Sequence, residues 1–564
     1  MGGFLIRPDT AVRPAAAVGF QELGLGPGID LKAGNWLVSV YSGRHEKAPC
    51  VYSDNHGFIA VAGTLWFEHA QGTGALQLAF RKFATGPEFL RDAFGHFALV
   101  IWKHGRLCVM ADAVGAFRIF FERSTPAVST SFLTLATALP RAHFDRQSIY
   151  EYVLSGAVLG DASLLEEIQT LPRDAILTFS ETDIVVERSK QELPVRSAAD
   201  KETLLDQTGE CLNRFFTATS SSKSNGLSCA LTAGYDSRLA LANLRHLGVP
   251  AHVFVYGRND ANVRIARQIA TGEGFDLEVI DRDSSPISPE AFPEVVHKNY
   301  LHDDGYDHEG FFTTNVEIEQ RLSRTAGGAF VHGGGGEIFR NYFLLSDGPK
   351  SAWDVVHAMY GKYDESVCAR GFDRHGYEER IVTKIEQLIG FKQKRYDRQI
   401  IEWLYPNFRC RAWFGRESSL NNMAGASFMP FYERNITDLA ATIPLNLKRA
   451  GMFESELIVR ADPRLAAYSS QYGHNFADPP PFRRTIGDTV KTQTPPILRP
   501  RLYALRERLG RSATEDYLSA TYVESVLGRE LHPVTTMFNM SVLHDPRMKS
   551  RVLSLAYLAC RLGL

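Results

Sequence analysis

Cysteine is scarce and scattered in this sequence of 564 residues: there are seven, an odd number, and no CxxC pair occurs. This usage predicts a reducing compartment and excludes a cysteine-based zinc site. Long hydrophobic runs are also missing, because the longest, 97–102 and 555–560, are far too short to span a bilayer. The N-terminus, MGGFLIRPDT, lacks a basic segment followed by an apolar one, so no secretory signal is predicted. We therefore expect a cytoplasmic protein that does not engage a membrane.

An excess of charge of either sign is absent as well. The 62 basic and 64 acidic side chains leave a formal net charge of −2, which removes the general electrostatic case for a nucleic-acid partner. A hydrophobic fraction of 44% with 22% charged residues is typical of globular proteins and excludes extensive disorder. The length predicts roughly two to four domains. These properties together favour a globular enzyme.

The pattern of apolar and polar residues changes near residue 195. Before it, short apolar or alternating segments separated by Gly, Asp or Asn predict β-structure, with one helix over 74–83. The polar segment 194–201 is typical of a linker. Beyond it, apolar residues at helical spacing predict an amphipathic helix, and most of the remaining chain is predicted to be helical. We therefore expect one domain over 1–195 and a second over 203–564.

The most informative stretch lies near the start of the second domain. LSCAL (227–231) predicts a strand, TAGYDSR (232–238) a turn, the segment 239–249 a helix, and AHVFVYG (251–257) a second strand. Strand, turn, helix and strand form a βαβ unit, the building block of a parallel α/β sheet.

The turn at 232–238 has the composition of an anion-binding site. Ala233 and Gly234 allow a tight backbone whose N–H groups converge, and Thr232 and Ser237 add hydroxyl donors at a helix N-terminus. Asp236 suits this site if Mg²⁺ separates it from phosphate. The turn matches neither GxxxxGK[ST] nor GxGxxG. On spacing alone, an ordinary turn in which Asp236 or Ser237 caps the helix has equal weight.

Several segments resemble the ATP pyrophosphatases of the asparagine synthetase type. TAGYDSR is similar to their SGGxDS signature, and VHGGGGEIFRNY (331–342) to their SGEGADELFGGY segment. Three further segments, 254–270, MPFYER (429–434) and 455–466, follow in the order of that family. GHFALVIW, ADAVGAFRIFF and STSFLTLATAL resemble its glutaminase-like half. The resemblance spans roughly residues 1–480.

This resemblance implies a fold and a set of ligands. The first domain would be an Ntn-hydrolase-like β-sheet domain, and the second a parallel sheet of the ATP-pyrophosphatase type with a helical extension. ATP would bind at the carboxyl ends of the parallel strands. Asp236 and Glu337 would hold Mg²⁺. The other nucleotide-binding positions implied by the motifs are Leu231, Thr232, Gly234, Ser237, Tyr256, Gly333 and Gly334.

The first domain departs from the glutamine-using members at its N-terminus. These carry a nucleophilic cysteine after the initiator methionine, whereas this chain has Gly2 and no cysteine before Cys50. In this respect it resembles the β-lactam synthetases, which lack the cysteine and use an amine of the substrate. We therefore expect a scaffold without glutaminase activity.

The second domain departs at three functional positions. Gly336 stands where the family has its second magnesium-binding aspartate, Gly333 where asparagine-forming members have a glutamate, and Gly473 where the family has a lysine. Asp303, Asp304 and Asp307 are candidates for the missing metal ligand, and a solvated acidic loop is the alternative. Arg460 and His474 are candidates for the charge of the missing lysine, so the candidate catalytic residues are Glu337, Arg460 and His474.

Two further features favour structural roles over functional ones. A lone histidine, His332, beside the glycines is more often structural than a catalytic base. The basic segment 499–511 is typical of a solvated helix face.

The function implied is an ATP-dependent ligase without glutamine hydrolysis. A carboxylate would be activated as an acyl-adenylate, with release of pyrophosphate, and an amine of the same or another molecule would then displace AMP. Its partners would be a small-molecule or peptide carboxylate and an amine, and a homodimer is a compatible assembly. The alternative is a non-catalytic nucleotide-binding homologue with a partner or regulatory role, which the missing aspartate and lysine favour.

Overall fold

The structure is a computed structural model. It describes residues 2–10, 18–84, 86–189, 191–220, 226–281, 286–314, 316–326, 328–509 and 516–564. The last part of the basic segment 499–511 therefore lies outside the described residues.

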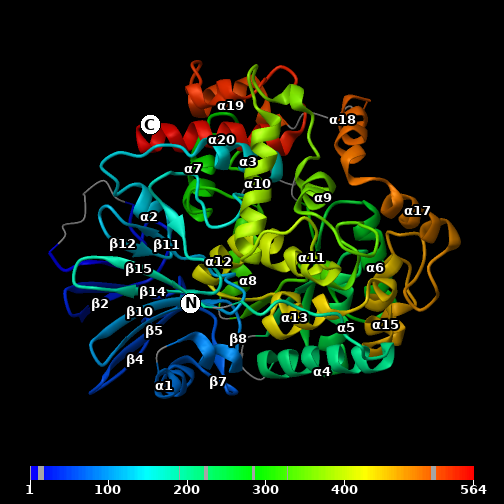
Figure 1. The fold of residues 1–564 in the computed structure, drawn as a ribbon, viewed down its shortest axis with the longest axis horizontal. Helices are drawn as coiled ribbons and strands as arrows, with labels where there is room; N and C mark the ends of the chain where they lie inside the picture. Colours follow the sequence, from blue (N-terminus) through cyan, green and yellow to red (C-terminus); the bar gives the residue numbers. More distant parts are fainter. Residues whose placement is uncertain are drawn as a thin grey trace.

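Two antiparallel six-stranded sheets form the N-terminal half (Figure 1). The first has the order β13-β11-β12-β1-β3-β2, and the second β15-β14-β10-β9-β5-β4. The strands of the first sheet are β1 (Gly3–Pro8), β2 (Gly28–Ala33), β3 (Trp36–Tyr41), β11 (Phe120–Glu122), β12 (Ala127–Ser129) and β13 (Gln169–Thr170). Those of the second are β4 (Cys50–Asp54), β5 (Gly57–Gly63), β9 (Phe97–Lys103), β10 (Arg106–Ala111), β14 (Ala175–Phe179) and β15 (Ile184–Arg188).

Burial on both faces explains the continuous apolar sequence of β9. Ala98 and Val100 face the large core that the two sheets share, whereas Leu99 and Ile101 face a smaller core beneath α1 (Gly72–Lys82). A strand covered on both sides shows no polar alternation. The helix predicted over 74–83 and the strands predicted over 97–102 and 106–110 are present, within one or two residues of the expected bounds.

Three short strands and two helices complete this half. The strands β6 (Trp66–Phe67), β7 (Ala70–Gln71) and β8 (Ala93–Phe94) form a small antiparallel sheet. Helix α2 (Phe132–Ala136) begins at Ser131, and α3 (Arg146–Ser155) at Asp145; both caps accept a hydrogen bond from a backbone N–H.

A five-stranded parallel sheet forms the centre of the C-terminal half, in the order β18-β17-β16-β19-β20. Its strands are β16 (Leu227–Ala230), β17 (Ala251–Tyr256), β18 (Leu277–Ile280), β19 (Ala329–Val331) and β20 (Ala426–Phe428). Helix α5 (Asp236–His246) joins β16 to β17, which confirms the predicted βαβ unit. Helix α4 (Lys201–Ser220) follows the irregular segment where the linker was predicted.

Helices surround this sheet, and the chain after its last strand is mainly helical, as predicted (Figure 1). The C-terminal α20 (Pro546–Leu562), red in the figure, lies beside α3, whereas α17 (Phe482–Gln493) and α18 (Arg499–Leu509) lie at the right-hand side of the view. The remaining α-helices are α6 (Ala261–Glu273), α7 (Phe292–His302), α8 (Val316–Thr325), α9 (Ala352–Val355), α10 (Arg374–Ile389), α11 (Arg398–Leu404), α12 (Phe414–Ala424), α13 (Arg434–Thr442), α14 (Leu445–Lys448), α15 (Met452–Ala461), α16 (Pro463–Ala466) and α19 (Ala520–Leu527).

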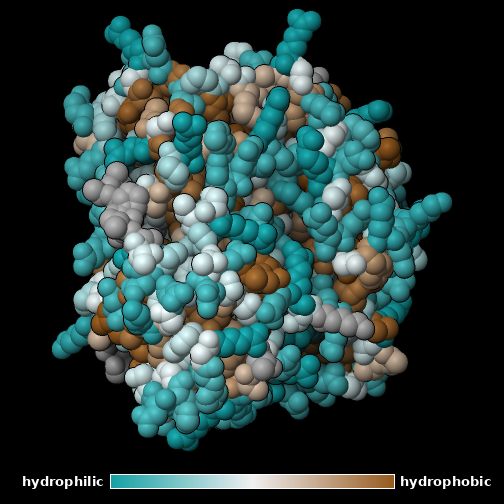
Figure 2. Space-filling view, turned by 60° about the vertical axis from the view of Figure 1, so that its left-hand side comes forward, coloured by the Kyte–Doolittle hydropathy of each residue, from teal (hydrophilic) through white to brown (hydrophobic). Residues whose placement is uncertain are grey.

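The surface is mainly hydrophilic on the face in Figure 2, where hydrophobic residues occur in separate small groups. Within the described ranges, no helix is both long and apolar enough to cross a membrane.

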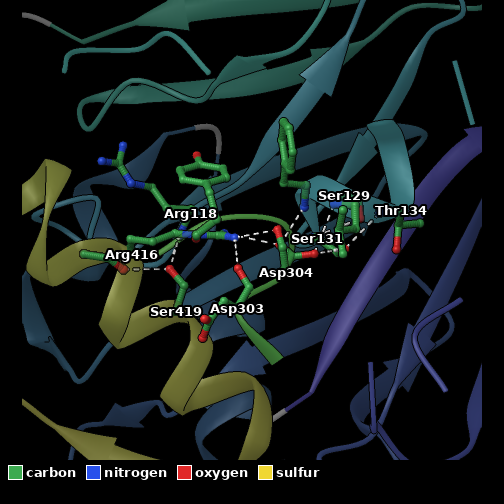
Figure 3. A network of polar contacts seen from close by, with 12 residues as sticks. Arg118, Ser129, Ser131, Thr134, Asp303, Asp304, Arg416 and Ser419 are labelled. Atoms are coloured by element: carbon green, nitrogen blue, oxygen red, sulfur yellow. Dashed lines mark hydrogen bonds and ion pairs between the residues drawn. The ribbon is translucent and has the colours of Figure 1, made fainter. Parts of the chain in front are cut away.

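A buried polar network joins the two halves, and Asp304 is its central acceptor (Figure 3). Its Oδ1 accepts from the Ser131 hydroxyl at 2.5 Å, its Oδ2 from the Phe132 N–H at 2.7 Å, and Arg416 Nη1 lies 3.2 Å from Oδ2. Ser131 and Phe132 begin α2 in the N-terminal half, whereas Arg416 belongs to α12. A carboxylate with these partners holds the halves in one fixed arrangement.

Candidate functional site

Two turns meet at the carboxyl ends of β16 and β19. The chain leaves β16 towards β17 on one side, whereas β19 pairs with β16 on the other side, so the strand order reverses between them. In open α/β sheets, such a reversal leaves a crevice in which ligands bind. The turn after β16 contains Thr232–Tyr235, and the turn after β19 contains His332–Gly335.

Close approach of these turns requires glycine at position 336. A Cβ there would lie 2.7 Å from the Asp236 carboxyl carbon, closer than such atoms come. At Gly333, a Cβ would lie 3.0 Å from the Ser237 backbone N. The position at which an aspartate was expected therefore carries no carboxylate and has no room for one while Asp236 keeps its place.

The turn at 232–238 is held by two of its own side chains and by Asn262 of α6. Ser237 Oγ accepts from the Thr232 N–H at 2.9 Å, Asn262 Oδ1 from the Ala233 N–H at 3.1 Å, and Thr232 Oγ1 from the Gly234 N–H at 3.3 Å. Helix α5 begins at Asp236 without a side-chain cap, so neither Asp236 nor Ser237 caps it. An anion at this turn would exchange these internal hydrogen bonds for its own.

Asp236 lies in a cluster of three carboxyl groups around Arg340. Arg340 Nη2 lies 2.6 Å from Asp236 Oδ1 and 3.7 Å from Glu337 Oε1, and Arg340 Nε lies 3.0 Å from Glu454 Oε2. Glu337 Oε2 also accepts from the Tyr405 hydroxyl at 2.8 Å. The two residues predicted to hold the metal are thus brought together, with a cation of the chain beside them.

Ionisation of the carboxyl groups in this cluster is unfavourable. Burial raises the pKa of Asp236 to about 6, although Arg340 lowers it, and Glu337 raises it further. Burial also raises the pKa of Glu454 well above its ordinary value, and the neighbouring Asp236 adds to this. Glu454 is fully buried, and neither of its carboxyl oxygens receives a hydrogen bond from the described residues. The single guanidinium of Arg340 therefore does not fully offset the cost of ionising these buried carboxyl groups.

A divalent cation would supply the positive charge that favours ionisation of these carboxyl groups. Mg²⁺ is commonly held by one or two protein carboxylates together with substrate phosphates. Asp236 and Glu337 supply that pair, whereas no group of three His, Cys, Asp or Glu residues in the described part of the chain is arranged to hold a metal ion by itself. A cation here would lower the carboxyl pKa values that burial raises.

The positions predicted to flank adenosine lie at the same edge of the sheet. Leu231 is fully buried directly after β16, and its N–H donates to the Phe254 carbonyl at 2.8 Å. Tyr256 ends β17, and its hydroxyl accepts from Arg324 Nη1 at 3.2 Å.

The loop containing His474 contacts the turn, whereas Arg460 does not reach it. The Gln471 N–H donates to the Ala233 carbonyl at 3.1 Å, which brings the loop beside the nucleotide turn. Burial lowers the pKa of His474, which disfavours the cationic form expected of it. Arg460 binds Asp206 and Glu202 on α4, so it is a structural residue of the α4–α15 contact.

The residues proposed to replace the lost ligand have other roles. Asp304 is occupied by the network that joins the two halves, and Asp307 pairs with His308 Nδ1 at 2.8 Å. Burial and the neighbouring Asp307 raise the pKa of Asp303. None of the three contacts Asp236 or Glu337 in the described structure.

His332 has no free nitrogen to act as a base. Its Nδ1 accepts from the Gly334 N–H at 2.9 Å, so the proton of the neutral ring lies on Nε2. Nε2 faces Glu417 Oε1 at 3.4 Å. This arrangement supports the structural interpretation of His332.

Sequence reasoning missed three members of the cluster. Arg340 lies three residues after Glu337, in VHGGGGEIFRNY. The similar motif SGEGADELFGGY has glycine at this position, so the difference could have identified Arg340 as a candidate site residue. Tyr405 and Glu454 lie on distant segments, and no local pattern connects them with the glycine-rich turn.

A cavity of about 390 Å³ adjoins the cluster. Glu337 and Arg340 form part of its wall, and Arg449 and Arg484 add positive charge. Arg449 is exposed and has no side-chain partner among the described residues, whereas Arg484 stacks on Tyr472, with its Cζ 4.1 Å from the ring centre. The cavity is large enough for a small acid or for the end of a longer chain.

The comparisons with known proteins give only weak matches. No protein-family model matches the chain, and no curated protein matches it in sequence. The solved structure of the allosteric regulatory enzyme of purine biosynthesis has 11% identity and a TM-score of 0.25, and the match covers 51% of this chain and 82% of the other. Glutamine phosphoribosylpyrophosphate amidotransferase from B. subtilis, in complex with ADP and GMP, has 12% identity and a TM-score of 0.23, with coverages of 54% and 79%. TM-scores this low carry no evidence of a shared fold or activity.

Proposed function

We propose that this protein is an ATP-dependent ligase that activates a carboxylate as an acyl-adenylate and transfers the acyl group to an amine. The observation that carries the proposal is the convergence of Asp236 and Glu337 on Arg340 at the strand-order reversal, where burial raises the pKa of Asp236. A nucleotide turn and a cation-binding carboxylate pair at this place are what Mg·ATP requires. The motif resemblance at 232–238 and 331–342 supports the same activity.

Each part of the site has a role in this proposal. The turn Thr232–Ser237, with Gly333 and Gly334 opposite, binds the pyrophosphate, and Leu231 and Tyr256 flank the adenosine. Asp236 and Glu337 hold Mg²⁺, which supplies charge neutralisation for the leaving pyrophosphate. Arg340 orients both carboxylates, because its guanidinium contacts each of them. Arg449 and Arg484 in the cavity wall attract the carboxylate substrate.

The chemistry joins an acid and an amine at the expense of the α–β bond of ATP. A carboxylate oxygen attacks the α-phosphorus, and the P–O bond to pyrophosphate breaks. The amine nitrogen then attacks the acyl carbon, AMP leaves, and the nitrogen loses a proton. That proton is released to solvent.

Glutamine is not the nitrogen donor in this proposal. Gly2 has a φ of +102°, and a Cβ there would lie 2.0 Å from the Tyr41 carbonyl oxygen, so the backbone has no space for a cysteine at this position. The N-terminal half then serves as a scaffold, which the hydrogen bonds from Ser131 and Phe132 to Asp304 join to the catalytic half.

A second candidate function is nucleotide binding without catalysis, in a partner or regulatory role. It is favoured by Gly336, which supplies no second aspartate, and by Gly473, which places no side chain near the turn. The internal hydrogen bonds of the turn at 232–237 also agree with a site that has become structural.

Exchange of radiolabelled pyrophosphate into ATP, with a panel of carboxylic acids, separates the two functions. A ligase exchanges label with the correct acid and releases AMP rather than ADP. Asp236→Asn and Glu337→Gln lower the exchange rate about 10²-fold or more, the scale of losing one preorganised electrostatic group. Arg460→Ala is the matched control and retains the rate. Tight Mg·ATP binding without exchange for any acid establishes the non-catalytic function instead.

A further inference from the structure

Helix α17 is amphipathic, but its apolar face points to solvent and its polar face lines the cavity. Its residues Arg484, Asp488 and Lys491 lie on the side that forms the cavity wall. Phe482, Ile486 and Val490 are four residues apart, so they share one face, and they are exposed by 78%, 45% and 60%. A surface helix ordinarily buries its apolar face against its own core. Here the polar face turns inward, and none of the residues of α17 is buried.

Further exposed apolar side chains follow this helix, up to and within α18. Of the eleven large hydrophobic side chains exposed within the described residues, seven lie between positions 482 and 505. We call these seven the outer stripe: Phe482, Ile486, Val490, Ile497, Leu498, Leu502 and Leu505. Proteins that act as monomers rarely expose a contiguous apolar patch larger than a few hundred Å², and larger patches mark interaction sites.

The outer stripe is held in place. Arg484 stacks on Tyr472 at the beginning of α17. Arg499, at the start of α18, donates to the carbonyls of Phe343 at 2.8 Å and Leu344 at 2.6 Å. The exposed face is therefore a built surface on an anchored segment, rather than a consequence of a detached helix.

Charge distinguishes the possible occupants of this surface. The segment 482–505 contains five basic residues and one acidic residue. Arg484, Lys491 and the acidic Asp488 line the cavity, and Arg499 binds backbone carbonyls, so Arg483 and Arg501 are the exposed basic residues that remain for the stripe. Two copies of the chain would bring like charges together at the stripe, which disfavours self-association. An amphipathic helix with acidic flanks would instead match both the apolar stripe and its basic border.

We propose that the outer stripe binds an acidic amphipathic helix of a separate polypeptide. The bound helix would lay its apolar face on Phe482, Ile486 and Val490, and its carboxylates beside Arg483 and Arg501. Because α17 also walls the cavity, and a helix is about 10–12 Å across, the partner would lie about one helix diameter from the candidate site. The inference does not depend on the ligase activity.

Fluorescence anisotropy tests the proposal with a labelled synthetic helix that carries leucines at positions i, i+3, i+4 and i+7 and glutamates elsewhere. We expect saturable binding that weakens with salt. Ile486→Ser combined with Val490→Ser weakens it at least about tenfold, because two apolar contacts are lost. Val185→Ser is the matched control, since Val185 is 46% exposed on the distant β15, and it leaves binding unchanged. Circular dichroism confirms that both variants keep the fold.

Four results would overturn the proposal. The first is no binding, and the second is equal binding of a peptide with lysine in place of glutamate. The third is preferential binding to vesicles containing phosphatidylserine, which would identify a lipid surface. The fourth is a dimer, seen by sedimentation, that the double variant dissociates, which would identify a second copy as the occupant.

Discussion

Arg340 Nη2 lies 2.6 Å from Asp236 Oδ1, so a guanidinium of the chain lies beside the carboxylate at which the sequence predicts a metal ion. The same guanidinium is 3.7 Å from Glu337, and the guanidinium and both carboxylates are partly buried. This contact keeps the carboxylates in place without a ligand. Arg340 supplies one positive charge to three carboxyl groups, so its removal should be costly, which is the basis of the first prediction.

Arg340→Gln is expected to destabilise the ligand-free protein by about 3–5 kcal/mol, because it leaves buried carboxylates without their counter-charge. Equilibrium unfolding in urea measures the loss. Millimolar Mg²⁺ should recover part of it, since the cation replaces the missing charge. Arg460→Gln is the control: its partners Glu202 and Asp206 are largely exposed, and it should cost at most about 1 kcal/mol. Equal losses in the two variants would contradict this account.

Asp304→Ala is expected to be strongly destabilising for a different reason. The carboxylate accepts from Ser131 and Phe132 in one half and pairs with Arg416 in the other, so its removal leaves buried donors unsatisfied. We expect a loss of about 3–5 kcal/mol in the free energy of unfolding. Separate unfolding of the two halves, seen by calorimetry as two transitions, would show their coupling directly. Glu181→Ala, in an exposed turn, serves as the control. A loss below about 1 kcal/mol would show that the network is not an anchor.

Gly2→Cys is expected not to create a glutaminase. The new Cβ would meet the Tyr41 carbonyl oxygen, and the φ of +102° disfavours any side chain. Glutamate release from glutamine measures the activity, and thermal unfolding measures the expected destabilisation. Gly209→Cys, at a position in α4 with open space around it, controls for the added thiol. Glutamine turnover by the Gly2 variant would show that the N-terminal half retains a working amidase site.

The buried Glu433 makes stability depend on pH. Burial raises its pKa to about 7, although His96 lowers it, whereas the unfolded carboxyl ionises near 4.5. Between these values the folded state binds more protons than the unfolded state, so this carboxyl lowers stability as the pH rises from about 4.5 to 7. Glu433→Gln should remove that decline and stabilise the protein at pH 7.5 by up to about 3 kcal/mol. The Gln oxygen can still accept from the Gly95 N–H, as Glu433 does at 2.9 Å.

Urea unfolding of both proteins from pH 4.5 to 7.5 measures this difference. Parallel stability curves for the wild type and Glu433→Gln would rule out the carboxyl as the source of the pH dependence.

Much of the fold followed from local sequence patterns. Apolar runs of strand length around 227–231 and 251–257, with a helix between them, predicted the βαβ unit, because side-chain periodicity reports local structure directly. The small residues of the turn at 232–238 indicated where two backbone segments approach closely. The absence of a cysteine at position 2 was likewise readable from the sequence, since a nucleophile is a matter of residue type.

Only the tertiary structure decided which charged residues meet. Asp304 looked like a candidate metal ligand, but its partners Ser131 and Phe132 lie 173 and 172 residues away in the chain. Arg460 looked like a replacement for the lost lysine, but it faces α4, and Arg340 and Glu454 complete the cluster instead. Composition and spacing determined where the chain turns and which chemistry it carries. The pairing of charges depends on segments that approach only after folding, because no local periodicity encodes a contact between residues so far apart.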